Sequence, residues 1–252
     1  MDPFSEQMKT PPPSKWYEKW WVILLIILLA IILIVGLGFG LAIFYFKKNI
    51  EAGSFYNPAT GEFTDELPMA PSNDPKNVVE VSVDDDPYLG SVYAPVTIIA
   101  FEDFQCPFCK EVQPIIKQVI DRYGDQVLFV YRDFPLIGVH ADAQNSAEAS
   151  ECAHEQNKFW EYHDLLFANQ SRQDIASLKN HAVELGLDSE RFNQCLDSRK
   201  YEQEVTADLR DALAAGVDAT PTWFINGVKY RGVLNVSMFE TLINAEIKYG
   251  GQ

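Results

Sequence analysis

The feature that most constrains this chain is an apolar run near its start. Residues 20–46 read WWVILLIILLAIILIVGLGFGLAIFYF and hold no charged side chain. As a helix these 27 residues span about 40 Å, more than the ~30 Å core of a bilayer. The run therefore predicts one transmembrane helix, with interfacial aromatic residues at both ends. These are Trp16, Trp20 and Trp21 on one side and Phe44, Tyr45 and Phe46 on the other.

A cleaved signal peptide is the alternative interpretation of this run. The apolar core of a signal peptide is shorter, about 7–15 residues, and a small-residue cleavage site follows it. The chain shows neither feature. Three lysines precede the run and two follow it, which hardly decides the orientation. We expect a single-pass protein of the cell membrane with a cytoplasmic tail over 1–19.

Composition separates a tether from a folded body beyond the run. Residues 47–77 are rich in Asn, Pro, Gly, Ser and acidic residues, which predicts a flexible linker. Residues 78–252 have the composition of one globular domain. Residues 1–50 carry +2 of the total charge of −16, which leaves −18 for the remainder. A body this acidic argues against nucleic acid and anionic lipid as partners.

Hydrophobic periodicity in the body predicts an α/β domain. The expected elements are strands over 78–83, 94–101 and 126–134, a helix over 110–124, a hairpin over 221–233 and a last helix over 235–249. The stretch between, about 138–215, lacks strand character and is typical of consecutive helices. Asn226-Gly227 is a strong signal for the turn of the hairpin. One mixed sheet with an inserted helical subdomain follows from this order.

Two of the four cysteines stand where a strand meets a helix, in the stretch FEDFQCPFC. Cys106 is expected at the helix N-terminus, where backbone N–H groups and the helix dipole stabilise a thiolate. Pro107 suits the first helical turn because its missing N–H would have no partner there. Cys109, one turn later on the same side, can close a disulfide with Cys106. Such a pair predicts thiol–disulfide exchange.

Two other uses of the dithiol stay open on this reasoning. A structural zinc site needs a second pair of ligands, and Cys152 and His154 lie on different faces of an expected helix. A merely structural Cys106–Cys109 bridge closes too short a loop to stabilise the chain much. In either case the chain would be a non-redox binding or chaperone module.

Other polar residues also carry competing interpretations. The acidic residues 84–86 fit a calcium site or a solvated turn. His140, at the start of the helical stretch, is a candidate to tune Cys106 or to cap a helix. Pro221 opens a strand, and a cis bond from Thr220 would expose backbone groups beside the dithiol to an extended peptide.

Four motifs, in this order, resemble the DsbA-like family of thioredoxin-fold disulfide oxidoreductases, especially the membrane-anchored bacterial type. The motifs are FEDFQCPFCK, FPLIGVH, ECAHEQNKFWEYHDLLF and GVDATPTWFING. The resemblance covers about 82–248 and implies a thioredoxin fold interrupted by a helical insert. It implies Cys106 as nucleophile, Cys109 as resolving thiol, and no cofactor or metal beyond this redox-active disulfide. The residues implied in substrate docking are Pro107, Phe108, Thr220 and the cis-proline Pro221.

The chain departs from the family pattern at two places. Thioredoxin-like relatives often carry a buried acid six residues before the first cysteine, where this chain has Ala100. Strand alternation sends Glu102 to the same face, so Glu102 is the candidate proton shuttle. The dipeptide between the cysteines is Pro-Phe rather than the Pro-His of strongly oxidising DsbA, so we expect a less oxidising pair.

Cys152 and Cys195 both fall in the helical insert, and some members of the family have a second bridge there. Such a structural disulfide would stabilise the chain by roughly 4 kcal/mol in the chain-entropy model. Two buried, unpaired thiols remain the alternative. The even number of cysteines fits an extracytoplasmic body.

The expected function is that of a membrane-tethered oxidase that introduces disulfides into exported proteins. The resemblance implies unfolded or reduced exported proteins as clients and a membrane quinone-linked thiol oxidase of the DsbB or VKOR kind as reoxidant. A reductase or isomerase of the same fold is the alternative, and the reduction potential separates the two.

Overall fold

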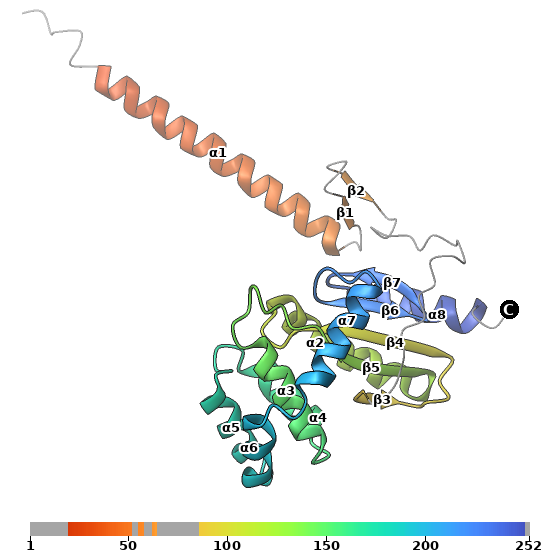
Figure 1. The fold of residues 1–252 in the computed structure, drawn as a ribbon. Helices are drawn as coiled ribbons and strands as arrows, with labels where there is room; N and C mark the ends of the chain where they lie inside the picture. The colour runs from red at the N-terminus through yellow and green to blue at the C-terminus, as the bar shows by residue number, and fades with distance from the viewer. Residues whose placement is uncertain (1–19, 52–54, 58–61, 65–85, 250–252) are drawn as a thin grey trace, which may run out of the picture. The chain divides into compact units, whose positions relative to one another are not determined.

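The computed structural model describes residues 20–51, 55–57, 62–64 and 86–249 (Figure 1). The chain divides into two compact units, Met1–Pro68 and Met69–Gln252, and each is described by itself. The second unit holds the main sheet, the dithiol and the helical insert.

The first unit contains helix α1 (Trp20–Glu51) and two strands, β1 (Phe55–Asn57) and β2 (Glu62–Thr64), that pair antiparallel. Within the described residues no helix qualifies by length and hydropathy as a membrane span, so the predicted span finds no support there. The predicted linker over 47–77 also contains more structure than expected. Its first residues continue α1, and the strand pair forms because the two segments are rich in aromatic strand formers.

Five strands form the main sheet, in the order β3-β5-β4-β6-β7. They are β3 (Tyr88–Gly90), β4 (Val96–Glu102), β5 (Val127–Asp133), β6 (Thr222–Ile225) and β7 (Val228–Arg231). β4 and β5 run parallel, and the other neighbouring pairs are antiparallel. Because β4 is the central strand, the loop that follows Glu102 begins near the middle of the sheet, at the carboxyl end of β4.

Helices cover both faces of β4 and β5, which explains the continuous apolar sequence of these strands. Ile99 and Phe101 belong to a core cluster with Ala212 of α7 (Glu202–Ala214). On the other face, α2 (Pro107–Tyr123) packs on β5, and α8 (Val236–Tyr249) packs on β4. There Trp223 of β6 meets the ring of Phe239 edge to face. The predicted α/β sheet is confirmed.

The strand predicted over 78–83 lies outside the described residues. Among those that the structure describes, the first strand of the main sheet is β3, which begins at Tyr88 and is not predicted by periodicity. β3 has only three residues, too few for a periodic signal. Its last residue, Gly90, has φ +92°, and a Cβ atom there would lie 2.0 Å from the carbonyl oxygen of Val127. Only glycine permits this close approach of β3 to β5.

The helical insert lies between β5 and β6, as predicted (Figure 1). Its helices are α3 (Ala143–His154), α4 (Phe159–Ala168), α5 (Ile175–Glu184) and α6 (Ser189–Asp197), followed by α7. Asp174 and Asp188 cap α5 and α6 by accepting backbone N–H groups. A disulfide joins Cys152 of α3 to Cys195 of α6, with an S–S distance of 2.01 Å.

The hairpin of β6 and β7 turns at the predicted dipeptide. Asn226 and Gly227 both have positive φ, 45° and 81°, as the tight hairpin turn requires. The Asn226 side chain accepts a hydrogen bond from the backbone N–H of Thr97 at 2.8 Å. The turn residue therefore also ties the hairpin to the start of β4.

Asp86 has a different partner from the calcium ion considered above. Its Oδ2 lies 3.1 Å from Nε of Arg132, a buried side chain that also pairs with Asp208 and Asp211 of α7. A buried guanidinium needs such carboxylates because an unpaired charge in the interior is costly. Asp84 and Asp85 lie outside the described residues, and the described part of the chain holds no group of acidic, His and Cys side chains suited to a metal.

Candidate active site

Cys106 lies at the N-terminal end of α2, with Pro107 as the first helical residue. Its backbone is extended (φ −72°, ψ 122°), and its N–H donates to the carbonyl of Asp103 at 3.0 Å. This short turn connects the end of β4 to the helix. Cys106 and Cys109 both carry free, buried thiols, whereas Pro107 and Phe108 between them are exposed.

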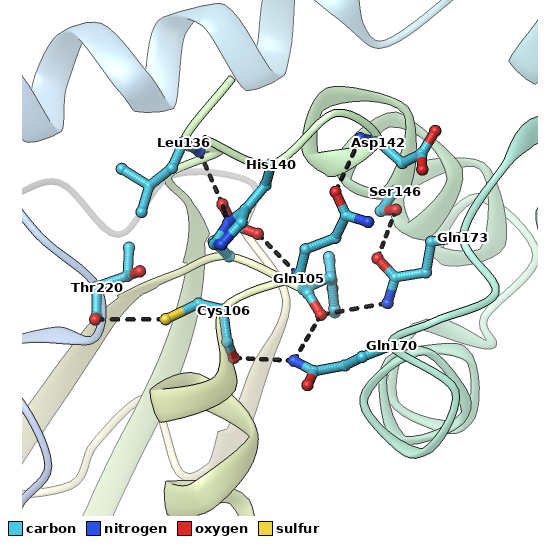
Figure 2. A network of polar contacts seen from close by, with 11 residues as sticks. Gln105, Cys106, Leu136, His140, Asp142, Ser146, Gln170, Gln173 and Thr220 are labelled. Atoms are coloured by element: carbon cyan, nitrogen blue, oxygen red, sulfur yellow. Dashed lines mark hydrogen bonds and ion pairs between the residues drawn. The ribbon is translucent and has the colours of Figure 1, made fainter. Parts of the chain in front are cut away.

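The loop before β6 meets this thiol from the other side. The Thr220–Pro221 bond is cis, and the Cys106 thiol donates to the carbonyl oxygen of Thr220 across 3.6 Å (Figure 2). The Thr220 hydroxyl oxygen is buried and has no hydrogen-bond partner among the described residues. Its hydrogen is therefore available to a thiolate on Cys106.

The surroundings of Cys106 lower its pKa to about 6. The largest cause is a hydrogen bond from the Cys109 thiol, which outweighs the cost of burial. Thr220 and the backbone N–H groups of Phe108 and Cys109 add to the effect. The helix N-terminus thus contributes as the sequence indicates, but the second thiol and the loop before Pro221 supply more of the stabilisation.

The environment of Cys109 acts in the opposite direction. Burial raises the pKa of this thiol well above its ordinary value, and Cys106 and Glu102 raise it further. At neutral pH the pair therefore consists of one thiolate that can react and one thiol that must lose its proton before it can react.

Glu102, the last residue of β4, lies close enough to affect both cysteines. Burial raises the pKa of its carboxyl to about 8, a hydrogen bond from Gln113 lowers it, and the charge of Cys106 raises it. Gln113 Nε2 lies 2.6 Å from Glu102 Oε2, while Glu102 Oε1 is buried with no partner among the described residues. Ala100 is also fully buried, two residues earlier on the same strand face.

His140 lies in the polar network around the dithiol and does not cap a helix. Its Nδ1 is 2.8 Å from Oδ2 of Asp103, which also accepts the backbone N–H of Leu136 at 2.7 Å (Figure 2). The residue preceding α3 at its N-terminus is Asp142. Since the Asp103 carbonyl accepts the Cys106 N–H, His140 is linked to Cys106 through Asp103.

Two glutamines of the insert that the sequence analysis does not identify hold the loop before Cys106. Gln170 Nε2 donates to the carbonyl oxygens of Phe104 at 3.0 Å and Cys106 at 2.8 Å (Figure 2). Gln173 Nε2 reaches the carbonyl of Phe104 at 3.2 Å, and its Oε1 accepts from Ser146. From the sequence, a buried glutamine predicts only that its amide needs hydrogen-bond partners. It does not predict that these partners lie more than 60 residues away along the chain.

Exposed apolar side chains lie between the two cysteines and in the loop that carries His140. Phe108 is 57% exposed, and Ile137 and Val139, in the loop that carries His140, are 63% and 78% exposed. Of the four residues expected to dock a substrate, Pro107 and Phe108 are exposed, while Thr220 and Pro221 are buried. The carbonyl oxygen of Thr220 contacts the Cys106 sulfur.

The profile of the thioredoxin family matches residues 82–245, most of the second unit. The chain belongs to the thioredoxin family. Wolbachia pipientis α-DsbA1 is similar in structure, with a TM-score of 0.60 and 23% identity, over 67% of this chain and 94% of that protein. Bacillus subtilis BdbD is similar with a TM-score of 0.55 and 25% identity, over 65% and 93%. For Pseudomonas aeruginosa DsbA2 the TM-score is 0.54 and the identity 27%, over 64% and 94%.

These neighbours are thiol–disulfide oxidoreductases of the DsbA family, and the predicted resemblance is confirmed. Curated proteins that the chain resembles carry a different name. A Na(+)/H(+) antiporter NhaA 3 of Salinispora tropica is 37% identical over 166 residues, 66% of this chain and 25% of the antiporter. A Na(+)/H(+) antiporter NhaA 1 of Mycolicibacterium vanbaalenii is 39% identical over 60% of this chain and 25% of the antiporter. The chain thus spans about a quarter of the length of these relatives.

Proposed function

We propose that this protein oxidises thiols of exported proteins by exchange with a Cys106–Cys109 disulfide. One observation carries the proposal: the Cys106 sulfur, at a helix N-terminus, lies 3.6 Å from the carbonyl oxygen that precedes a cis-proline. The N–H groups at the helix N-terminus stabilise the Cys106 thiolate, and the loop before the cis-proline offers backbone groups that can pair with an extended peptide. The DsbA-type neighbours support the same chemistry.

The exchange has two steps. A client thiolate attacks Cys106 Sγ, the Cys106–Cys109 bond breaks, and its electron pair stays on Cys109 Sγ. A second client thiolate attacks the client sulfur of the mixed disulfide and releases Cys106 as a thiolate. The client loses two electrons and gains a disulfide, and the Cys106–Cys109 pair is reduced. Pro107, Phe108, Thr220 and Pro221 form the docking surface for the client in this proposal.

Glu102 is the proton carrier in the proposal. Cys109 leaves the disulfide as a thiolate in a site that disfavours the charge, and a carboxyl with a pKa of about 8 can supply the proton at neutral pH. During reoxidation the carboxylate takes this proton back, so that Cys109 can attack. His140 acts indirectly, by fixing Asp103 and with it the turn before Cys106.

The direction of electron flow depends on the reduction potential of the pair. A pKa of about 6 for Cys106 lies between the values of about 7 in thioredoxin and about 3.5 in DsbA. This observation favours a pair less oxidising than DsbA and makes a disulfide reductase or isomerase the second candidate. A low thiolate pKa stabilises the reduced pair and therefore makes the disulfide a stronger oxidant.

We also propose that the protein is anchored in the cell membrane with its body on the extracytoplasmic side. The support is the sequence of residues 20–46, which lacks both charge and a polar face. Since no helix of the described residues qualifies as a membrane span, the anchor rests on the sequence. An anchor would hold the body near a quinone-linked reoxidant of the DsbB or VKOR kind. Alkaline extraction of membranes tests it: an anchored chain stays in the pellet, and release contradicts the anchor.

The reduction potential of Cys106–Cys109 tests the redox proposal. The full chain in detergent is equilibrated in glutathione buffers, and its thiols are trapped and assigned by mass spectrometry. A potential close to that of strong oxidants, about −120 mV, supports an oxidase, and one close to that of thioredoxin, about −270 mV, reverses the flow. A dithiol that does not titrate, in a chain whose Cys106→Ser variant still binds clients, makes the protein a non-redox binding module.

A further inference from the structure

Glu102 has no direct contact with solvent. Its side chain is 1% exposed, and only one of its two carboxyl oxygens has a hydrogen-bond partner. At neutral pH a carboxyl with a pKa of about 8 is mostly protonated beside the reduced pair, so Glu102 must give its proton to water before it can take the proton of Cys109. The contact that controls this exchange must lie between Glu102 and the nearest solvent-filled space.

Gln113 occupies that position. It lies one helical turn after Cys109 on α2, and its Nε2 donates both to Glu102 Oε2 at 2.6 Å and to the Cys109 carbonyl at 2.8 Å. Its half-buried side chain also lines a pocket of about 400 Å³ between α2, α4 and the sheet. Other walls of this pocket are Pro114, Phe129 and Trp160. Of the pocket's lining residues, Gln113 is the one bonded to Glu102.

We propose that Gln113 is the positioning residue of the proton carrier and that this pocket is the route by which Glu102 exchanges protons with water. The inference rests on the proposed role of Glu102. While bonded, the amide N–H favours the carboxylate form and fixes it beside Cys109. When the amide turns into the pocket, which has room for it, water reaches the carboxyl.

Reoxidation of the Cys106–Cys109 pair shows where this proton and the electrons go. During reoxidation by a disulfide, the Cys106 thiolate attacks one sulfur of the oxidant, the S–S bond of the oxidant breaks, and its other sulfur leaves as a thiolate. A mixed disulfide of Cys106 with the oxidant remains. Glu102 carboxylate takes the proton of the Cys109 thiol, and Cys109 Sγ attacks Cys106 Sγ and expels the oxidant's remaining sulfur as a thiolate. Glu102 has given its own proton to water in the pocket before this transfer, and afterwards it holds the Cys109 proton, which the next exchange with a client returns. In the opposite direction each transfer is reversed.

The test measures the attack of Cys109 directly. The reduced full chain in detergent is mixed with excess oxidised glutathione between about pH 5 and 9, and the decay of the mixed disulfide is followed by acid quenching and mass spectrometry. In the parent, this decay accelerates as Glu102 ionises. Gln113→Leu fills the same space without a donor. In this variant the carboxylate loses one hydrogen bond. The pH profile of the decay rate therefore shifts to higher pH by about one unit, and the decay at pH 7 slows about tenfold.

Two variants serve as controls. Gln118→Leu makes the same change on the exposed side of α2, where Gln118 bonds only its own helix at Pro114, and leaves the profile where it was. Gln113→Asn keeps the amide but shortens its reach, so it moves the profile in the same direction as Gln113→Leu even if the leucine variant folds poorly. Alkylation of Cys106 as a function of pH reports the integrity of the site.

The outcomes separate the two proposals. If Glu102→Gln leaves the pH profile unchanged, the proposed role of Glu102 is wrong, and the role of Gln113 falls with it. If Glu102→Gln abolishes the titration while both Gln113 variants behave as the parent, Glu102 is the carrier and the positioning role of Gln113 is wrong.

Discussion

The two cysteine pairs of this chain are about equally buried, yet their surroundings differ in kind. Cys106 and Cys109 are 4% and 0% exposed, and Cys152 and Cys195 are 1% and 6% exposed. Cys152 and Cys195 lie within helices, where the backbone N–H groups are already bonded. Cys106 precedes a helix whose first N–H groups are free to stabilise its thiolate. Hydrogen-bond donors, rather than exposure, therefore separate the thiol with the lowered pKa from the cysteines of the structural bridge.

The largest expected effect comes from removing the reactive sulfur. Cys106→Ala should reduce the oxidation of a thiol-containing peptide to the uncatalysed rate, because no other described thiol combines a lowered pKa with a neighbouring cysteine. The measurement is the rate of peptide disulfide formation with glutathione disulfide as oxidant. Catalysis that survives in this variant would remove the distinction between the two pairs.

Removing the second pair should affect stability instead. In the chain-entropy model, a bridge across a sequence separation of 43 residues contributes about 4 kcal/mol to the free energy of unfolding. The double variant Cys152→Ala/Cys195→Ala should lose roughly this amount in urea denaturation while the rate of peptide oxidation barely changes. A fall in rate without a fall in stability would instead assign the second bridge a part in the exchange.

Glu102 should lower the free energy of unfolding as the pH rises. Its pKa is raised from 4.5 to about 8 on folding, so the folded chain holds a proton that the unfolded chain releases. The stability cost grows as the pH rises above 4.5 and is complete above about 8. Glu102→Gln should therefore gain a few kcal/mol over the parent by pH 8 and little at pH 4.5. Unfolding free energies measured across this range check the prediction, and a constant difference would contradict it.

Gln170 should matter less, and mainly for the geometry of the dithiol. Gln170→Leu removes the donor to the carbonyls of Phe104 and Cys106 and should cost about 1–3 kcal/mol. Gln118→Leu, on an exposed helix face, is the matched control. Proton exchange at the backbone N–H of Gln105 and Cys106 should quicken in the first variant only. Equal protection in both variants would show that the insert does not hold this loop.

The parts of the fold that the sequence predicts are those with a local cause. The turn at Asn226-Gly227 follows from the need for positive φ at both positions, and the start of α2 at Pro107 follows from the preference of proline for the first helical residue. β4 and β5 follow from their buried apolar runs. β3 has three residues and one obligatory glycine, which is too little for any periodicity to register.

By itself, the sequence predicted the dithiol on which the proposed redox chemistry depends. The spacing of Cys106 and Cys109 and their place between a strand and a helix are local features. Tertiary structure alone decided that Thr220 contacts Cys106 from 114 positions away, that Gln113 and not Cys109 bonds Glu102, and that Gln170 holds the loop. These contacts depend on which distant segments the fold brings together, and local periodicity carries no information about partners across such separations.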